Sequence, residues 1–441
     1  MRFAILISLF TITSAASAWT PNPDDPDGGG WPMPPDTPLG DPWNPEDPMP
    51  PLPGDLIDFP EHWDGEFPDF PFQCRIDVPE DYDTIQEAVD AADDDCLIVV
   101  AEGTYFETVV IDGKAVRIVG TGEVLIRPDA DEAIFTITST PADHTVQLDG
   151  LQMRSVWTLA HPVTGEEIPI PAESGRAVSA VAAAVRITNC VFEDLSVGQV
   201  DAAGTTQSGG AIIMFIGSLE VDSCDFTNCV ADDGGAIACG WAQVSVSQSQ
   251  FAGCSATSNG GAMYVTGSEA SLSQCSFIAS EAASAGGHLS SDSSTLSLHR
   301  CGFWGGSAAW GGAVSTDGVT TATLSQNQFR YHSAGESGDV WWHDTTGGAG
   351  PWLADSKLCS GTSTVGTTEG IVPLETYVDC PFCLDDMDMD GVIGVEDLID
   401  LLSVWGTRDP FADGNNDGTV DAEDIVDLIE DFGGCGDFVP I

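Results

Sequence analysis

Cations are scarce in this 441-residue chain, which has 12 Lys and Arg against 70 Asp and Glu. The formal net charge of −58 argues against nucleic acid or an anionic membrane surface as a partner, because each phosphate contact requires a cation. Beyond the first residues no apolar run approaches the ~20 residues of a membrane-spanning helix, so no membrane span is expected. Hydrophobic residues nevertheless make up 42% of the chain, which excludes a wholly disordered protein.

Residues 1–18 have the features of a secretory signal peptide. Arg2 supplies a positive start, an apolar stretch follows, and Ala16-Ser17-Ala18 is a small-x-small cleavage site. The mature protein is therefore expected to be secreted, and to be extracellular or on the cell surface. Export permits disulfides, although the 13 cysteines are odd in number.

Residues 19–73 are expected to form a proline-rich acidic linker. Sixteen of the 27 prolines and thirteen acidic residues fall in this stretch, which has no Lys or Arg. Proline fixes φ and like charges repel, so the linker should be extended. Its aromatic residues have two interpretations: they are docking points for a partner, or the linker is a spacer whose distal aromatics pack on the next domain.

Residues 74–378 carry an internal repeat of about 26 positions. Gly-Gly pairs recur at 209–210, 234–235, 260–261, 286–287 and 311–312. A parallel column places a phenylalanine two residues after Cys, Ser or Asn, at Phe192, Phe226, Phe251, Phe277, Phe303 and Phe329. Short β-prone runs fill each repeat. The pattern predicts a parallel β solenoid with rungs ~4.8 Å apart, an interior file of phenylalanines and Gly-Gly turns that exclude Cβ.

A short helix is expected ahead of the first strands. Thr84 and Glu87 fit a capping box, and Ile85, Ala88 and Val89 fall on one helical face. Such a helix would cover the open edge of the first rung, where unpaired backbone groups are a pairing hazard.

The cysteines within the repeats allow more than one chemistry. Cys74 and Cys96 bracket the expected helix and are candidates for a disulfide. Cys229 and Cys254 occupy equivalent positions on adjacent rungs, where a disulfide and a stack of buried thiols both fit the spacing.

The segment from Val78 to Gly122 resembles the start of pectin-lyase-like right-handed parallel β-helix proteins. The Gly-Gly and Cys-x-Phe repeats are similar to those of polymorphic outer-membrane proteins. The resemblance implies a mostly β fold, a right-handed parallel β-helix solenoid, in a superfamily of lyases, hydrolases, esterases and non-enzymes. His288 and His299 are the candidates for an acid and a base, and the alternative is that both are surface or turn residues.

Two acidic loops 27 residues apart carry the clearest chemical signal. Each has carboxylate or amide oxygens at loop positions 1, 3, 5 and 12, a glycine at position 6 and a backbone carbonyl at position 7, which is the oxygen cage that Ca²⁺ prefers. The candidate ligands are Asp386, Asp388, Asp390, Val392 and Asp397 in the first loop, and Asp413, Asn415, Asp417, Thr419 and Asp424 in the second. We expect Ile393 and Val420 to pair across the loops, and helices to follow at 398–405 and 425–432.

A calcium loop followed by one helix, in two copies, resembles dockerin type I domains. Asp379-Cys380-Pro381 leaves no room for the entering helix of an EF-hand before Asp386. The resemblance implies a small all-α calcium domain at residues 379–441 that docks onto a cohesin-like protein.

These features together predict a secreted calcium-binding β-helix protein. It would act as a carbohydrate- or protein-binding module, with a polysaccharide or cell-surface glycan as ligand, anchored or assembled through the dockerin-like domain. The alternative is a polysaccharide-degrading enzyme, a pectate or uronate lyase or an O-glycosyl hydrolase, in a dockerin-linked complex. A carboxylate cluster flanked by Arg or His in a groove would favour the enzyme.

Overall fold

The computed structural model of the chain is mostly β-structure, with a large sheet of parallel strands and two short helices near the C-terminus. The expected signal peptide and linker, residues 1–18 and 19–73, lie outside the described residues. In the part of the chain that is described, no helix has the length and apolarity needed to cross a bilayer. The described residues are 74–128, 132–142, 144–155, 157–160, 167–170, 175–197, 207–318, 321–337, 341–343, 352–354, 357–359, 365–367, 370–371, 387, 392–409, 412–413, 419–430 and 433–434.

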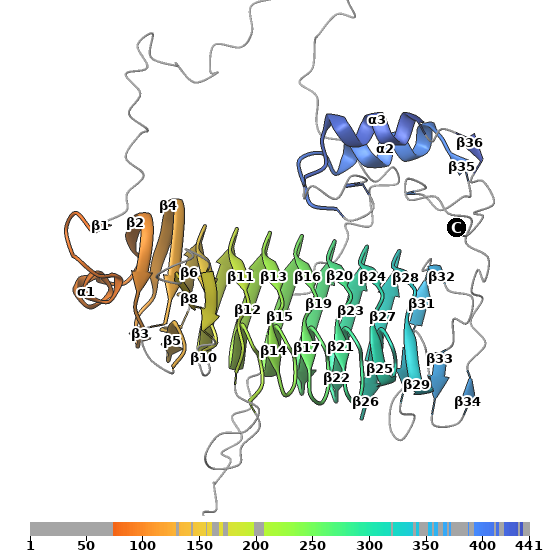
Figure 1. Ribbon diagram of the computed structural model, residues 1–441, viewed down its shortest axis with the longest axis horizontal. Coiled ribbons are helices and arrows are strands. Elements are labelled where there is room, and N and C mark those ends of the chain that lie inside the picture. The colour runs from red at the N-terminus through yellow and green to blue at the C-terminus, as the bar shows by residue number, and fades with distance from the viewer. Residues whose placement is uncertain are drawn as a thin grey trace, which may run out of the picture. The chain divides into compact units, whose positions relative to one another are not determined.

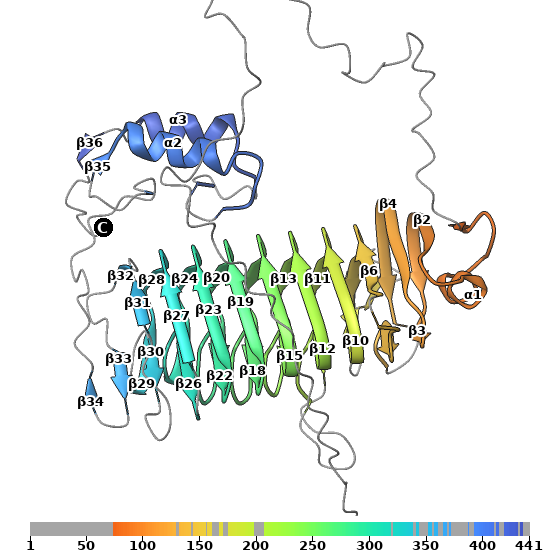
Figure 2. The ribbon, with the colours of Figure 1, turned by 180° about the vertical axis from the view of Figure 1, so that it is seen from behind.

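Parallel pairing between successive repeats builds the sheet. β13 (Asp225–Thr227) pairs with β16 (Gln250–Ala252), which pairs with β20 (Ser276–Ile278), so each partner lies 25 or 26 residues further along the chain. These strands lie side by side in Figures 1 and 2. The register is compatible with a β-helical solenoid, as the repeat length predicts.

Four ladders of strands follow the repeats. The phenylalanine ladder consists of β7 (Gln152–Arg154), β11 (Val191–Glu193), β13, β16, β20, β24 (Gly302–Trp304), β28 (Gln328–Arg330) and β32 (Lys357–Cys359). A short ladder consists of β14 (Val230–Ala231), β17 (Ser255–Ala256), β21 (Glu281–Ala282), β25 (Ser307–Trp310) and β29 (Ser333–Ser337).

The other two ladders share three long strands, β10 (Val178–Thr188), β12 (Ile212–Asp222) and β15 (Ile237–Ser247). One contains β3 (Val109–Asp112), β5 (Phe135–Thr138), β18 (Met263–Thr266), β22 (Leu289–Asp292), β26 (Val314–Asp317), β30 (Trp341–His343) and β33 (Val365–Thr367). The other contains β1 (Arg75–Val78), β2 (Cys96–Phe106), β4 (Val116–Arg127), β6 (Val146–Asp149), β19 (Glu269–Ser273), β23 (Thr295–His299), β27 (Thr321–Ser325) and β31 (Trp352–Ala354). Antiparallel pairs are formed by β8 (Trp157–Ala160) with β9 (Glu167–Ile170), β33 with β34 (Gly370–Ile371), and β35 (Val392–Ile393) with β36 (Gly433–Gly434).

The predicted file of phenylalanines is confirmed. The six rings from Phe192 to Phe329 are fully buried and stack with centroids 4.6 to 4.8 Å apart and planes within 5° of parallel. This distance equals the spacing between hydrogen-bonded strands, so equivalent side chains on successive rungs meet face to face. The stack therefore sets the register of the array, because a slip of one residue would turn each ring to the other face.

The Gly-Gly turns are also confirmed. Gly234 and Gly260 have φ of 62° and 63°, in the left-handed region. A Cβ on Gly261 would lie 2.0 Å from the carbonyl oxygen of Gly287, on the next rung. The first glycine of a pair thus supplies the turn and the second admits the neighbouring backbone, and a larger residue fits neither requirement.

The N-terminal helix begins where its capping residues predict. α1 (Ile85–Ala91) follows Thr84, whose hydroxyl accepts a 3.1 Å hydrogen bond from the Glu87 amide. Glu107, on the following turn of chain, caps the helix as well, because its carboxylate accepts from the amides of Ile85 and Gln86 at 3.1 Å each. The buried face of α1 packs against β1, β2 and β3, at the first rung.

The two questions about cysteine pairing have different answers. Cys74 and Cys96 form the expected disulfide, which ties the start of β1 to β2. Cys229 and Cys254 are buried free thiols, so the stack of thiols is the correct alternative. Each of these two sulfurs donates to backbone carbonyl groups, including Thr227 and Ala252.

Candidate functional site

Two of the predicted calcium ligands hold equivalent places in the C-terminal region. Asp397 and Asp424, at loop position 12, lie in the first turns of α2 (Val395–Ser403) and α3 (Ala422–Glu430) and are each 1% exposed. One carboxylate oxygen of Asp397 accepts from the Gly394 amide at 2.7 Å, and one of Asp424 accepts from the Asp421 amide at 2.7 Å. In both copies the carboxylate at loop position 12 therefore accepts a hydrogen bond from the backbone amide at loop position 9, and this bond fixes where the carboxylate lies.

The other predicted ligands are described only in part. Asp413 is buried and its amide donates to the Asp409 carbonyl at 3.0 Å, while Thr419 lies at the edge of a cavity. Val392 pairs through its backbone with Gly434. Among the residues that the structure describes, no three acidic, His or Cys side chains gather as a metal site. The calcium site stays a prediction, because five ligands lie outside the described residues: Asp386, Asp388, Asp390, Asn415 and Asp417.

The pairing predicted between Ile393 and Val420 differs in detail. Both side chains are buried in one small core with Leu401 and Leu428. Their backbones pair elsewhere, because Ile393 lies opposite Gly433 and Val420 exchanges hydrogen bonds with residues 406 and 407. Each loop is therefore closed by the segment that follows a helix, and the two position-8 side chains meet only in the core.

Each C-terminal helix has a second apolar face, which is exposed. Val395, Ile399 and Leu402 on α2 are at least half exposed, and so are Val426 and Ile429 on α3. Ile399 and Leu402 correspond to Val426 and Ile429, 27 residues later in the duplicated loop–helix unit, whereas Val395 corresponds to Ala422. Two matching apolar stripes thus remain uncovered in the described structure, beside helices that together bury Leu401 and Leu428.

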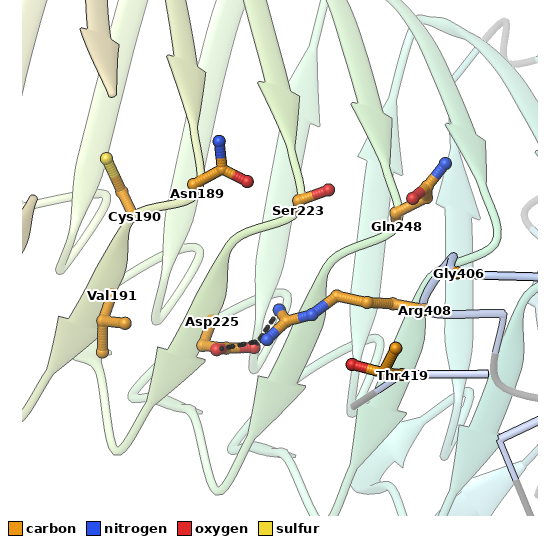
Figure 3. A pocket seen from close by; sticks show the side chains of 9 residues that line it. All are labelled: Asn189, Cys190, Val191, Ser223, Asp225, Gln248, Gly406, Arg408 and Thr419. Carbon is orange, nitrogen blue, oxygen red and sulfur yellow. Dashed lines mark hydrogen bonds and ion pairs between the residues drawn. The ribbon is translucent and has the colours of Figure 1, made fainter. Parts of the chain in front are cut away.

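A cavity of about 290 Å³ lies where the segment after α2 meets the strand array. Figure 3 shows Arg408 reaching Asp225, with distances of 2.6 and 3.0 Å between their paired nitrogen and oxygen atoms. The hydrogen bonds that Arg408 donates to the carboxylate of Asp225 raise the pKa of Arg408. The cavity is otherwise lined by Asn189, Cys190, Val191, Ser223, Gln248, Gly406 and Thr419.

The two histidines proposed as an acid–base pair have separate environments. His288 is fully buried between Phe277 and Phe303, and burial lowers its pKa well below the ordinary value. The alternative of a surface residue is wrong for His288, which lies buried at the bend that follows Gly287. His299 is exposed and contacts Ser325. The array therefore does not bring these two rings together as a catalytic pair.

Exposed apolar side chains gather at one bend of the array. Val181, Phe215, Ile216 and Trp241 lie on β10, β12 and β15, and Trp241 is 60% exposed. The rings of Phe215 and Trp241 meet edge to face with centroids 4.9 Å apart. Ile216 and Trp241 have φ of 60° and 51°. Non-glycine residues rarely adopt this backbone region, so the bend holds an exposed aromatic ring at a cost in strain.

Comparisons with known proteins identify no family. No protein-family model matches the chain, and no curated protein matches it. Among solved structures it is similar to one described as ORF18 of Geobacillus virus E2, with 10% sequence identity and a TM-score of 0.26. The match covers 67% of this chain and 61% of that one, so the chain spans less than two thirds of the length of the matched protein.

Proposed function

We propose that the protein is a secreted, calcium-binding right-handed parallel β-helix of the pectin-lyase-like type with a dockerin-like C-terminal domain. Its β-helix binds a polysaccharide or a cell-surface glycan or protein, and its C-terminal domain anchors or assembles it. The parallel register and the stacked phenylalanines support the solenoid. The exposed aromatic cluster of Val181, Phe215, Ile216 and Trp241 carries the binding role.

The aromatic cluster suits a sugar ring better than a phosphate. Aromatic faces offer apolar area to the C–H face of a sugar, and the cluster contains no charged side chain. The surrounding net charge of −58 would repel anionic glycans, so we expect neutral polysaccharides to bind.

Affinity electrophoresis of the full chain in gels that contain neutral polysaccharides tests the binding role. Trp241→Ala should abolish most of the retardation that the parent shows. Tyr331→Ala is the matched control, because Tyr331 is also 60% exposed but lies outside the cluster. Equal retardation of Trp241→Ala and the parent would contradict the assignment of the binding role to the cluster. If neither protein is retarded, the proposal that the array binds a neutral glycan is wrong.

The C-terminal domain is proposed to dock a protein through its two exposed apolar stripes. The stripe on α2 has spacings of four and three residues and the one on α3 a spacing of three, which is the pattern of a helix face that enters a groove. Acidic residues such as Glu396, Asp400 and Asp427 flank the stripes. A cohesin-like partner would need an apolar surface with a basic rim.

Calcium binding is tested by titrating the full chain with CaCl₂ in a calorimeter. We expect about two sites, as two loops with five oxygen ligands each provide. Asp424→Asn keeps an acceptor for the Asp421 amide and removes a charge, and it should weaken one site about tenfold or more. Asp427→Asn is the control, since Asp427 is exposed on the same helix. Identical titrations of the two variants would show that Asp424 is not a ligand.

A further inference from the structure

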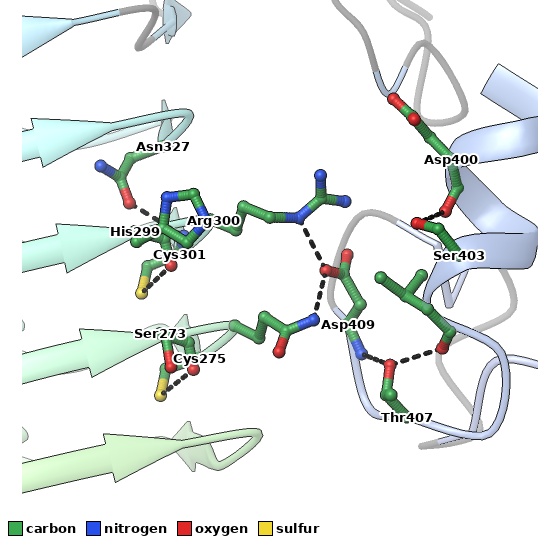
Figure 4. Close-up of polar contacts among 12 residues, drawn as sticks. Ser273, Cys275, His299, Arg300, Cys301, Asn327, Asp400, Ser403, Thr407 and Asp409 are labelled. Atoms are coloured by element: carbon green, nitrogen blue, oxygen red, sulfur yellow. Dashed lines mark hydrogen bonds and ion pairs between the residues drawn. The ribbon is translucent and has the colours of Figure 1, made fainter. Parts of the chain in front are cut away.

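Two charged pairs join the segment after α2 to the strand array, and their charges run in opposite senses. Arg408 contributes the cation to one pair and Asp225 of β13 the anion. Asp409 contributes the anion to the other, where it accepts from Arg300 Nε at 2.9 Å and Gln274 Nε2 at 3.0 Å (Figure 4). The C-terminal segment and the array thus each supply one cation and one anion. Only one orientation of the segment on the array brings both opposite-charge pairs together.

The partners on the array come from two columns of repeat positions. The first column is the left-handed residue before the Cys/Ser position of each repeat, and the second lies two residues later, at the start of the phenylalanine ladder. Across five successive rungs the columns contain a single acid and a single cation, and both meet the C-terminal segment, as does Gln274. The first column is Asn189, Ser223, Gln248, Gln274 and Arg300, and the second is Val191, Asp225, Gln250, Ser276 and Gly302.

This composition is unusual for a chain of net charge −58. An acidic domain approaching an acidic array is repelled unless the contact surface lacks acids and offers cations. Asp409 is 0% exposed, and a buried carboxylate without a partner is strongly unfavourable. The columns therefore form a surface that is nearly free of acids, on which Arg300 receives Asp409 and the single acid, Asp225, receives Arg408.

The docked segment lies directly before the second predicted calcium loop, residues 413–424, and is hydrogen-bonded to it. The carbonyl of Asp409 accepts from the amides of Ala412 and Asp413, at 3.1 and 3.0 Å. The amide of Val420 donates to the carbonyl of Thr407 at 2.8 Å, so the segment is bonded to the first residue of the loop, Asp413, and to its position 8. Closing the loop around an ion would fix Asp409 in the position in which it meets the array.

We propose that the C-terminal domain docks onto these two columns of its own chain, and that calcium binding in the second loop strengthens this docking. The calcium part rests on the calcium binding proposed above. Calcium binding orders the segment, and docking requires the ordered segment. The entropy cost of ordering is therefore incurred only once, so calcium binding and docking favour each other.

Trypsin cleavage after Arg408 in the full chain measures the docking, because the docked arginine is held against Asp225. Asp225→Asn leaves the cleavage site intact and should raise the cleavage rate in CaCl₂ about tenfold. Glu220→Gln is the control, because it breaks an exposed pair with Arg186 elsewhere on the array and should cleave like the parent. Cleavage of Asp225→Asn at the parent rate would overturn the docking.

The calcium arm repeats the digestion with EGTA in place of CaCl₂, with rates normalised to a synthetic arginine peptide in the same tube. In the parent, EGTA should raise the rate at Arg408 about as much as Asp225→Asn does in CaCl₂. If EGTA acts equally on parent and Asp225→Asn, calcium orders the loop without docking and the coupling is wrong. If EGTA has no effect, the coupling is also wrong, and the calorimetric titration decides whether calcium binding fails with it.

Discussion

His332 makes the core of the array sensitive to acid. Its Nδ1 accepts from the Gly306 amide at 3.0 Å, and its Nε2 lies 3.0 Å from the carbonyl oxygen of Phe303, to which the neutral ring donates. Burial lowers the pKa of His332 from 6.5 to about 4. A second proton would place an N–H against the Gly306 amide, so the geometry also favours the neutral ring.

The sign of the effect follows from which state binds the proton. Between pH 6.5 and pH 4 the unfolded ring is protonated while the folded ring is neutral, so the free energy of unfolding falls as the pH falls. A pKa lowered from 6.5 to about 4 corresponds to about 3 kcal/mol across the whole window. About 2 kcal/mol of this is lost between pH 7 and pH 5.

His332→Asn should remove this loss. Asn327 shows that the array accepts such a side chain, because its Oδ1 accepts from the Cys301 amide and its Nδ2 donates to the Leu298 carbonyl. Urea unfolding at pH 7 and pH 5, at fixed calcium, gives the change in unfolding free energy for each protein. The parent and the control His299→Asn, an exposed site, should lose about 2 kcal/mol more than His332→Asn. Equal losses in all three proteins would refute the reasoning.

Two substitutions test the packing of the rungs by the same urea unfolding. Gly261→Ala should cost about 3 kcal/mol, because its Cβ would lie 2.0 Å from the Gly287 carbonyl oxygen, whereas Gly113→Ala, at a φ of 67° with open space around it, should cost about 1 kcal/mol. Phe251→Ala should cost about 3–5 kcal/mol by opening a cavity in the stack, and the half-exposed Phe215→Ala well under half of that. A Gly261→Ala protein as stable as Gly113→Ala, or equal costs for the two phenylalanines, would contradict the stacked arrangement.

The features that repeat, or that depend on neighbours in sequence, could be predicted. The phenylalanine file and the Gly-Gly turns recur at one spacing, and the cap that Thr84 provides to α1 involves an amide only three residues later. Both C-terminal helices begin about three residues earlier than predicted, because Asp397 and Asp424 belong to their first turns and hold the backbone of position 9. Strands such as β12 and β15 are longer than the apolar runs suggest, since a single left-handed residue bends each without ending its pairing.

Two features that depend on how one repeat differs from the others were not predicted, the buried His288 and the docking surface. His288 follows a Gly-Gly pair, where the other repeats have a buried alanine, and the sequence gives no reason to place it inside. The His288 ring fits because residue 306 is a glycine, at which a Cβ would lie only 2.6 Å from the ring. The docking surface was missed because its columns stand out only when equivalent positions of all repeats are compared for the absence of acids. That comparison needs only the repeat spacing, so the signal was present in the sequence.

The contact between the C-terminal segment and the array depends on the number of rungs between Asp225 and Arg300. Asp225 and Arg300 lie three rungs apart, about 14 Å at the spacing of parallel strands, while their partners Arg408 and Asp409 are adjacent in sequence. Whole repeats gained or lost after Arg300 would leave this span unchanged, whereas one gained or lost between Asp225 and Arg300 would move one anchor out of reach. Duplication of a repeat within this window is therefore incompatible with keeping both contacts, whereas duplication outside it leaves the distance between the two anchors unchanged.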